Sequence, residues 1–126
     1  MLSKEKIMAF VGISDADKAR AFYQDTLGLN LISEDGFALV FDVNGTILRA
    51  TLLKEVHAQP HTVLGWEVKD ATAIARALAK SGVKVERYAH VPQDEDGIWT
   101  APGGAKIAWF RDPDGNILSI AQMLAS

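Results

Sequence analysis

The segment Phe41-Asp42-Val43-Asn44-Gly45-Thr46-Ile47-Leu48 recurs later in the chain as Phe110-Arg111-Asp112-Pro113-Asp114-Gly115-Asn116-Ile117-Leu118, with one extra residue in the turn. Each copy sets a turn between two runs of apolar residues. Asn44-Gly45 is a strong hairpin signal, because both residues tolerate a positive φ angle. The repetition indicates that the chain contains two copies of one structural unit.

Outward from these two segments, both halves show the same pattern of one strand, one helix and three further strands. In the first half the pattern predicts elements at Ile7–Ile13, Ala16–Leu27, Asn30–Ser33, Phe37–Asp42 and Thr46–Leu53. In the second half it predicts them at Thr62–Val68, Ala71–Ser81, Val83–Tyr88, Lys106–Arg111 and Asn116–Gln122. Helix ends are marked by N-cap candidates and by following glycines, namely Ser14, Asp15, Asp70, Gly28 and Gly82.

These elements predict an α+β fold of two tandem βαβββ units, about residues 7–54 and 61–122, in one domain spanning residues 1–126. One helix can cover only one face of its sheet, so the other face must meet a second unit, another chain or a ligand. We therefore expect the eight strands to form a cupped mixed sheet around a hollow that binds a small molecule.

Composition excludes several classes of protein. The 126 residues are 48% hydrophobic with a net charge of −3, which gives no electrostatic reason to bind nucleic acid or an anionic membrane. There are no cysteines, so disulfides, thiol catalysis and cysteine-based zinc sites are excluded. No apolar run suits a membrane span or a signal peptide, and a cytoplasmic protein is expected.

Two motifs together resemble the vicinal oxygen chelate superfamily, the group of glyoxalases, bleomycin-resistance proteins and extradiol dioxygenases. The first is Ala21-Phe22-Tyr23 followed by Leu27-Gly28-Leu29, and the second is the hairpin Asp112-Pro113-Asp114-Gly115-Asn116. The resemblance covers about Ile7 to Gln122. It implies the glyoxalase/bleomycin-resistance fold, with any chemistry at four inward-pointing positions where His, Gln or Glu side chains hold a divalent metal.

Carried over to this sequence, the four metal-ligand positions fall on Met8, Arg49, Val63 and Ser119. Such ions prefer imidazole or carboxylate ligands. Valine offers no lone pair, methionine sulfur is too soft, and arginine brings a positive charge to the place of a cation. We therefore expect no metal and no cofactor at this site.

The alternative is a metal site at a different place, with His61 as a ligand. His61 lies two residues before Val63 and would share its face of the strand. His57 is interpreted as part of the linker and His90 as part of an inserted loop, which spans residues 89–104.

Strand alternation and the loop predict which side chains line the hollow. The lining is apolar and aromatic with a few polar groups, as is typical of ligand pockets. The predicted ligand-binding residues are Met8, Phe10, Arg49, Val63, Glu67, Trp99, Trp109 and Ser119. Arg49 could bind a carboxylate or pair with Glu67. Trp99 would either pack under the inserted loop or close over a ligand, whereas Gln93-Asp94-Glu95-Asp96 lacks the spacing of a calcium loop.

Three functions remain open at this point. The first is metal-free binding of a small, partly aromatic molecule, as in bleomycin-resistance proteins. The second is a metal-independent isomerase or lyase on a small oxygenated substrate, with Glu67 as the candidate base. The third is a metal-dependent glyoxalase or dioxygenase with an unconventional ligand set. Family members of this type commonly form homodimers, which the linker Glu55–Pro60 would permit.

Overall fold

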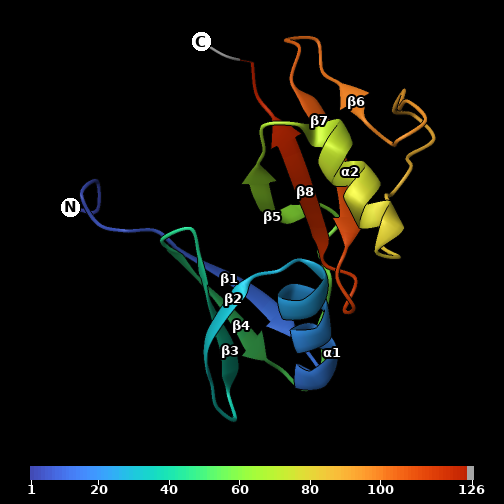
Figure 1. Cartoon of the computed structure of the whole chain (residues 1–126). Coiled ribbons are helices and arrows are strands. Elements are labelled where there is room, and N and C mark those ends of the chain that lie inside the picture. Colours follow the sequence, from blue (N-terminus) through green and yellow to red (C-terminus); the bar gives the residue numbers. More distant parts are fainter. Residues whose placement is uncertain (125–126) are drawn as a thin grey trace. The chain divides into compact units, whose positions relative to one another are not determined.

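The computed structural model describes residues 1–124 and shows an α+β protein with two four-stranded mixed sheets (Figure 1). Each sheet belongs to its own compact unit, the first formed by Met1–Ala58 and the second by the chain from Gln59 onward. The predicted fold class is therefore confirmed.

The first unit contains β1 (Met8–Ile13), α1 (Ala16–Arg20), η1 (Ala21–Thr26), β2 (Asn30–Glu34), β3 (Ala38–Val43) and β4 (Thr46–Leu52). Its strand order is β1-β4-β3-β2; β1 and β4 are parallel and the other pairs antiparallel. The helix begins where the Asp15 carboxylate accepts a hydrogen bond from the backbone N–H of Lys18. The predicted single helix is thus an α-helical turn that continues as the π-helical η1.

The second unit repeats this arrangement with β5 (Thr62–Glu67), α2 (Ala71–Lys80), β6 (Trp99–Thr100), β7 (Lys106–Arg111) and β8 (Ile117–Gln122). The strand order is β5-β8-β7-β6, again with one parallel pair, β5 and β8. Asp70 caps α2 by accepting from the N–H of Ala73. Equivalent pairing in both sheets agrees with the repeat seen in the sequence.

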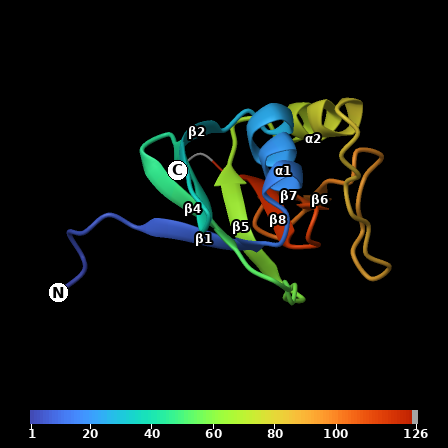
Figure 2. The ribbon, with the colours of Figure 1, turned by 90° about the horizontal axis from the view of Figure 1, so that it is seen from below.

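The strand predicted at Val83–Tyr88 is wrong. This segment makes only one isolated bridge, between Val85 and Phe110, and the fourth strand is the two-residue β6 from the inserted loop. β6 pairs with Lys106 and Ile107, the first two residues of β7. The segment around Val85 can therefore pair only with the later part of β7, where Val85 meets Phe110. Figure 2 shows this long connection between α2 and β6 in yellow to orange.

In each unit one face of the sheet packs against the helix and forms the core. The buried side chains on that face include Val11, Ile13, Phe41 and Leu48 in the first unit, and Ala108, Phe110, Leu118 and Ile120 in the second. Alternate residues of the same strands point to the other side, where Met8 is 50% and Phe10 58% exposed. We call this second side of each sheet its open face.

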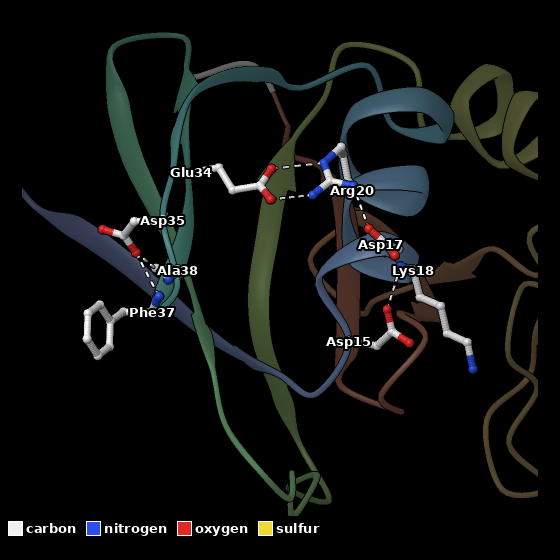
Figure 3. A network of polar contacts seen from close by, with 8 residues as sticks. All are labelled: Asp15, Asp17, Lys18, Arg20, Glu34, Asp35, Phe37 and Ala38. Carbon is white, nitrogen blue, oxygen red and sulfur yellow. Dashed lines mark hydrogen bonds and ion pairs between the residues drawn. The ribbon is translucent and has the colours of Figure 1, made fainter.

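Turns and ion pairs fix the register of the first sheet. Asn44 and Gly45 both have positive φ angles, 50° and 91°, as the hairpin signal requires. In Figure 3 the Arg20 guanidinium makes a bidentate ion pair with Glu34 of β2 and also contacts Asp17. These hydrogen bonds raise the pKa of Arg20. The network therefore ties the helix to the outermost strand.

A buried carboxylate, that of Asp112, holds the hairpin that forms the second motif of the family resemblance. Asp112 accepts hydrogen bonds from the backbone N–H groups of Asp114 and Asn116, at 3.0 and 2.9 Å, and from the Asn116 side-chain amide at 2.8 Å. Such bonds satisfy the turn locally. This motif therefore sets the register in which β8 returns along β7.

Candidate functional site

The open face of the second sheet gathers four of the eight predicted ligand-binding residues, namely Glu67, Trp99, Trp109 and Ser119. Strand register places them in two adjacent rows across the sheet, because side chains of paired residues share a face. One row consists of Glu67, Ala121, Ile107 and Trp99, and the next consists of Gly65, Ser119 and Trp109. The rows bring together residues from four strands, and register partners such as Gly65 and Ser119 are 54 positions apart in the sequence.

Three aromatic rings form one side of this face. Trp99 and Trp109 are stacked, with ring centroids 6.0 Å apart and planes inclined by 25°. Tyr88 meets Trp109 edge-on at 5.5 Å and 76°. All three side chains are half-buried, so each keeps surface accessible to a ligand. We call these three residues the aromatic cluster.

Small side chains form the floor beside the aromatic cluster. Gly65, Ser119 and Ala121 occupy adjacent positions on β5 and β8. A Cβ atom on Gly65 would lie 2.7 Å from the Ser119 Oγ, closer than such atoms approach one another. The floor is therefore low next to the indole of Trp109, as binding a flat molecule requires.

Of the charged side chains on this face, Arg111 has an ion-pair partner and Glu67 has none within residues 1–124. Arg111 Nε donates to Glu86 Oε1 at 2.5 Å, and its Nη1 donates to the carbonyl of Gly115 at 2.8 Å. Glu67 is exposed, and its side chain makes no hydrogen bond or ion pair within residues 1–124. The charge that this face offers to a ligand is therefore negative rather than positive.

The remaining predicted residues of the site lie on the first unit, with the exception of Val63, which is on β5. Phe10 of β1 and Arg49 of β4 are register partners on the open face of the first sheet, and Met8 pairs with Ile47 one step further along the face. Arg49 is half-buried. The structure thus divides the predicted residues between two open faces, one in each unit.

The positive charge of Arg49 also affects the Asp35 carboxylate, which lies in the turn between β2 and β3. The Asp35 carboxylate accepts from the backbone N–H groups of Phe37 and Ala38, at 2.7 and 3.0 Å (Figure 3). These two hydrogen bonds lower the pKa of Asp35, and the positive charge of Arg49 contributes further in the same direction.

The four positions where the family holds a metal do not fit one here. They are occupied by a thioether, a guanidinium, an isopropyl group and a hydroxyl, on Met8, Arg49, Val63 and Ser119. This donor set contains neither imidazole nor carboxylate. Within residues 1–124, no three His, Asp or Glu side chains come together in a geometry that could hold an ion.

The three histidines are exposed. His61 immediately precedes β5, and His90 lies in the inserted loop. His57 lies 3.8 Å from Glu55 within the linker. The structure therefore gives the alternative histidine site no set of converging ligands among the described residues.

Sequence reasoning missed Tyr88 and Gln93 as parts of this site. The sequence pattern places Tyr88 at the end of a predicted strand and Gln93 within the inserted loop. Gln93 is half-buried, and its amide makes hydrogen bonds with the backbone of the segment that carries Tyr88 and of the segment that leads to Trp99. An available signal was the aromatic residue itself, since Tyr88 immediately precedes the inserted loop that carries Trp99.

Comparison with known proteins agrees with this architecture. A protein from Bacillus subtilis (strain 168), described as uncharacterized protein YraH, is 32% identical and aligns with 89% of this chain and 93% of its own length. A glyoxalase family protein from Enterococcus faecalis matches with a TM-score of 0.75 at 20% identity, over 97% of this chain and 100% of that one. A bleomycin resistance determinant encoded on the transposon Tn5 also gives 0.75, at 17% identity and the same coverage.

No helix in the described part of the chain combines the length and apolarity that crossing a bilayer needs.

The family profile named Glyoxalase/Bleomycin resistance protein/Dioxygenase superfamily matches residues 7–120, nearly the whole of both units. With the repeated mixed sheets and the relatives above, this match shows that the chain belongs to the glyoxalase/bleomycin resistance protein/dioxygenase superfamily.

Proposed function

We propose that this protein binds a small, partly aromatic molecule on the open face of the second sheet, without a metal ion. The observation that carries the proposal is the aromatic cluster of Tyr88, Trp99 and Trp109 beside a floor of small residues. Half-buried aromatic rings supply flat apolar surface at little entropic cost, and aromatic pairs prefer stacked or edge-on contacts such as these. The ligand would lie against the exposed indole surface and cover Ser119.

The charges favour a neutral or cationic ligand over an anionic one. Arg111 is already paired with Glu86, whereas Glu67 is free of partners within residues 1–124. A cation near the rings would also be attracted by their π faces. Among its structural neighbours the chain resembles a bleomycin resistance determinant, and binding without metal chemistry is the function that this residue set supports best.

Calorimetric titration with three naphthalene probes of similar size tests the proposal. Naphthylmethylammonium, naphthylmethanol and naphthoate share the aromatic ring and carry a cationic, a neutral and an anionic substituent. We expect the cation to bind at least as tightly as the alcohol, and the anion more weakly. Trp109→Ala should weaken binding by about tenfold, because a stacked ring contributes about 1 kcal/mol beyond its buried area.

Trp66 provides the matched control, because it stacks on Phe110 with centroids 6.3 Å apart on the side of the sheet that faces α2. Trp66→Phe should leave probe binding unchanged. Failure of all three probes to bind at millimolar concentration, or equal binding by Trp109→Ala, would overturn the proposal.

Metal-independent catalysis through Glu67 is the second candidate, favoured only by the presence of this unpaired carboxylate on the same face as the aromatic cluster. Glu67 is exposed, whereas a general base is usually prepared by burial among apolar groups. Turnover of a bound oxygenated compound that Glu67→Gln abolishes would establish it; binding without turnover leaves the protein a binder.

We also propose that the chain forms a homodimer through the first unit. Ile7, Met8 and Phe10 are 81%, 50% and 58% exposed and follow one another along the start of the first sheet. Phe37, at the β2–β3 turn, adds a further exposed ring. A concentration of exposed apolar side chains on one unit typically marks an interaction surface, and a second copy of the chain is the partner that the superfamily suggests.

A further inference from the structure

We propose that Gln93 is a positioning residue that assembles the aromatic cluster and thereby sets its affinity for aromatic ligands. This inference rests on the proposed function and concerns a residue of the inserted loop. The loop brings β6 to the sheet and therefore carries Trp99. The contacts of Gln93 hold the rings of Tyr88 and Trp99 against Trp109.

The side-chain amide of Gln93 makes three hydrogen bonds to the backbone. Its Nε2 donates to the carbonyl oxygens of Glu86 and Gly97, both at 2.8 Å. Its Oε1 accepts from the N–H of Tyr88 at 2.9 Å. An amide has two donor hydrogens and an acceptor oxygen, so both donors and the oxygen are used.

These three backbone groups belong to the two segments that deliver the outer rings. Glu86 and Tyr88 lie on the segment that ends in the Tyr88 ring, and Gly97 is two residues before Trp99. Gln93 and Trp99 are themselves paired by a β-bridge. One side chain therefore fixes both the segment that carries Tyr88 and the segment that carries Trp99, while Trp109 is held by the regular pairing of β7 with β8.

The loop has other attachments that do not involve Gln93. The Asp94 carboxylate accepts from the N–H groups of Asp96 and Ile98, both at 2.9 Å, and the Ile98 side chain is 3% exposed. Arg76 of α2 makes a two-point contact with Asp96, at 3.2 and 3.1 Å. Loss of the Gln93 amide should therefore loosen the rings without releasing the loop.

The contacts also favour one interpretation of Trp99, a packed position, over the other, closure over a ligand. Its ring stacks on Trp109, and the segment before it is anchored through Ile98 and Gln93. Trp99 is thus part of a built wall of the site rather than a mobile cover. Preorganised rings bind a ligand more tightly, because less conformational freedom is lost on binding.

Gln93→Met tests the inference, because methionine nearly keeps the size of glutamine but makes none of the three hydrogen bonds. Two stacked indoles couple their electronic transitions and give a paired positive and negative band in the far-ultraviolet circular dichroism spectrum. We expect Gln93→Met to reduce this band and to weaken binding of naphthylmethylammonium by about tenfold. Trp109→Phe identifies the band, since it removes one of the two indoles.

Asp96→Ala is the matched control, because it breaks the attachment of the loop to α2 and leaves the Gln93 bonds in place. It should keep the coupled band and the affinity and lower the melting temperature less than Gln93→Met does, because an exposed ion pair contributes less than three part-buried hydrogen bonds. Gln93→Asn, which keeps the amide on a shorter side chain, is a second variant and should lose part of the band.

An unchanged band in both Gln93 variants would overturn the inference, as would equal loss of the band in Asp96→Ala. Failure of the probe to bind the unsubstituted protein would instead contradict the proposed function, while the coupled band would still report whether Gln93 positions the rings. The two failures are therefore distinguishable.

Discussion

Gly65 of β5 and Ser119 of β8 lie so close together that a Cβ atom on Gly65 would come within 2.7 Å of the Ser119 Oγ and 3.3 Å of the Ser119 carbonyl oxygen. The two residues are register partners in the row that also contains Trp109. Glycine is thus favoured here by the close approach of the neighbouring strand, and it keeps the floor of the proposed site low.

Gly65→Ala should both destabilise the second sheet and obstruct the site. We expect a loss of about 1–3 kcal/mol in the free energy of unfolding, because the added methyl group overpacks the contact with Ser119. Binding of naphthylmethylammonium should weaken as well. Denaturant unfolding and calorimetry measure the two effects. The double variant Gly65→Ala, Ser119→Ala should recover part of the stability, and a single variant that folds and binds like the original protein would argue against this description of the floor.

Divalent metals should not stabilise the protein. A metal bound only by the folded state at a hundred times its Kd would add about 2.7 kcal/mol to the free energy of unfolding, which a melting experiment detects easily. We expect the melting temperature to be unchanged with zinc, nickel or manganese, because Met8, Arg49, Val63 and Ser119 form no suitable ligand set. A rise that His61→Ala abolishes would show that the histidine alternative is correct and the metal-free proposal wrong.

Asp35 should make part of the stability of the first unit dependent on acid pH. Because hydrogen bonds from Phe37 and Ala38 lower the pKa of Asp35 in the folded state, the folded protein binds this proton less readily than the unfolded chain. The stabilisation is therefore fully present above the ordinary carboxyl pKa of about 3.9 and is lost as the pH falls through the lowered value.

Asp35→Asn removes the titrating group and should flatten this part of the acid dependence. Denaturant unfolding measured from neutral to acidic pH gives the comparison. Asp25→Asn, an exposed substitution with the same change of charge, is the control. Equal acid dependence in the Asp35 variant and the original protein would contradict the assignment.

Phe10→Ser should weaken association of the chain with itself. The Phe10 side chain is 58% exposed, so its removal costs the isolated chain little, whereas an interface that covers it would lose a buried ring. Sedimentation equilibrium should show a dimer for the original protein and a shift toward monomer for the variant. Phe22→Leu, a substitution in η1, is the control for loss of an aromatic ring elsewhere in the first unit. A monomeric original protein would refute the proposed dimer.

Most of the fold was predictable because its signals are local. Asp15 and Asp70 mark helix starts as N-caps, and Asn44-Gly45 marks a hairpin because both residues adopt positive φ. The alternation of Val11 and Ile13 with Met8 and Phe10 separates the covered face from the open one. Each of these features depends on neighbours a few residues away.

The inserted loop could not be predicted in the same way, because its structure depends on contacts between distant residues. Val83–Tyr88 has the composition of a strand, yet Trp99 and Thr100 occupy the first two residues of the β7 edge that it would need. Gln93 resembles any polar loop residue in the sequence. Its importance follows only from the backbone groups of Glu86, Tyr88 and Gly97 that converge on it.

Titration of the three indole N–H signals by nuclear magnetic resonance tests the central claim most directly. The protein has three tryptophans, of which Trp99 and Trp109 lie on the open face and Trp66 on the face toward α2. Trp→Phe variants assign the signals. With naphthylmethylammonium or naphthylmethanol we expect the Trp99 and Trp109 signals to shift in a saturable manner and the Trp66 signal to stay in place. Signals of Trp99 and Trp109 that do not move with either probe, or a shift of Trp66 alone, would contradict ligand binding at the aromatic cluster.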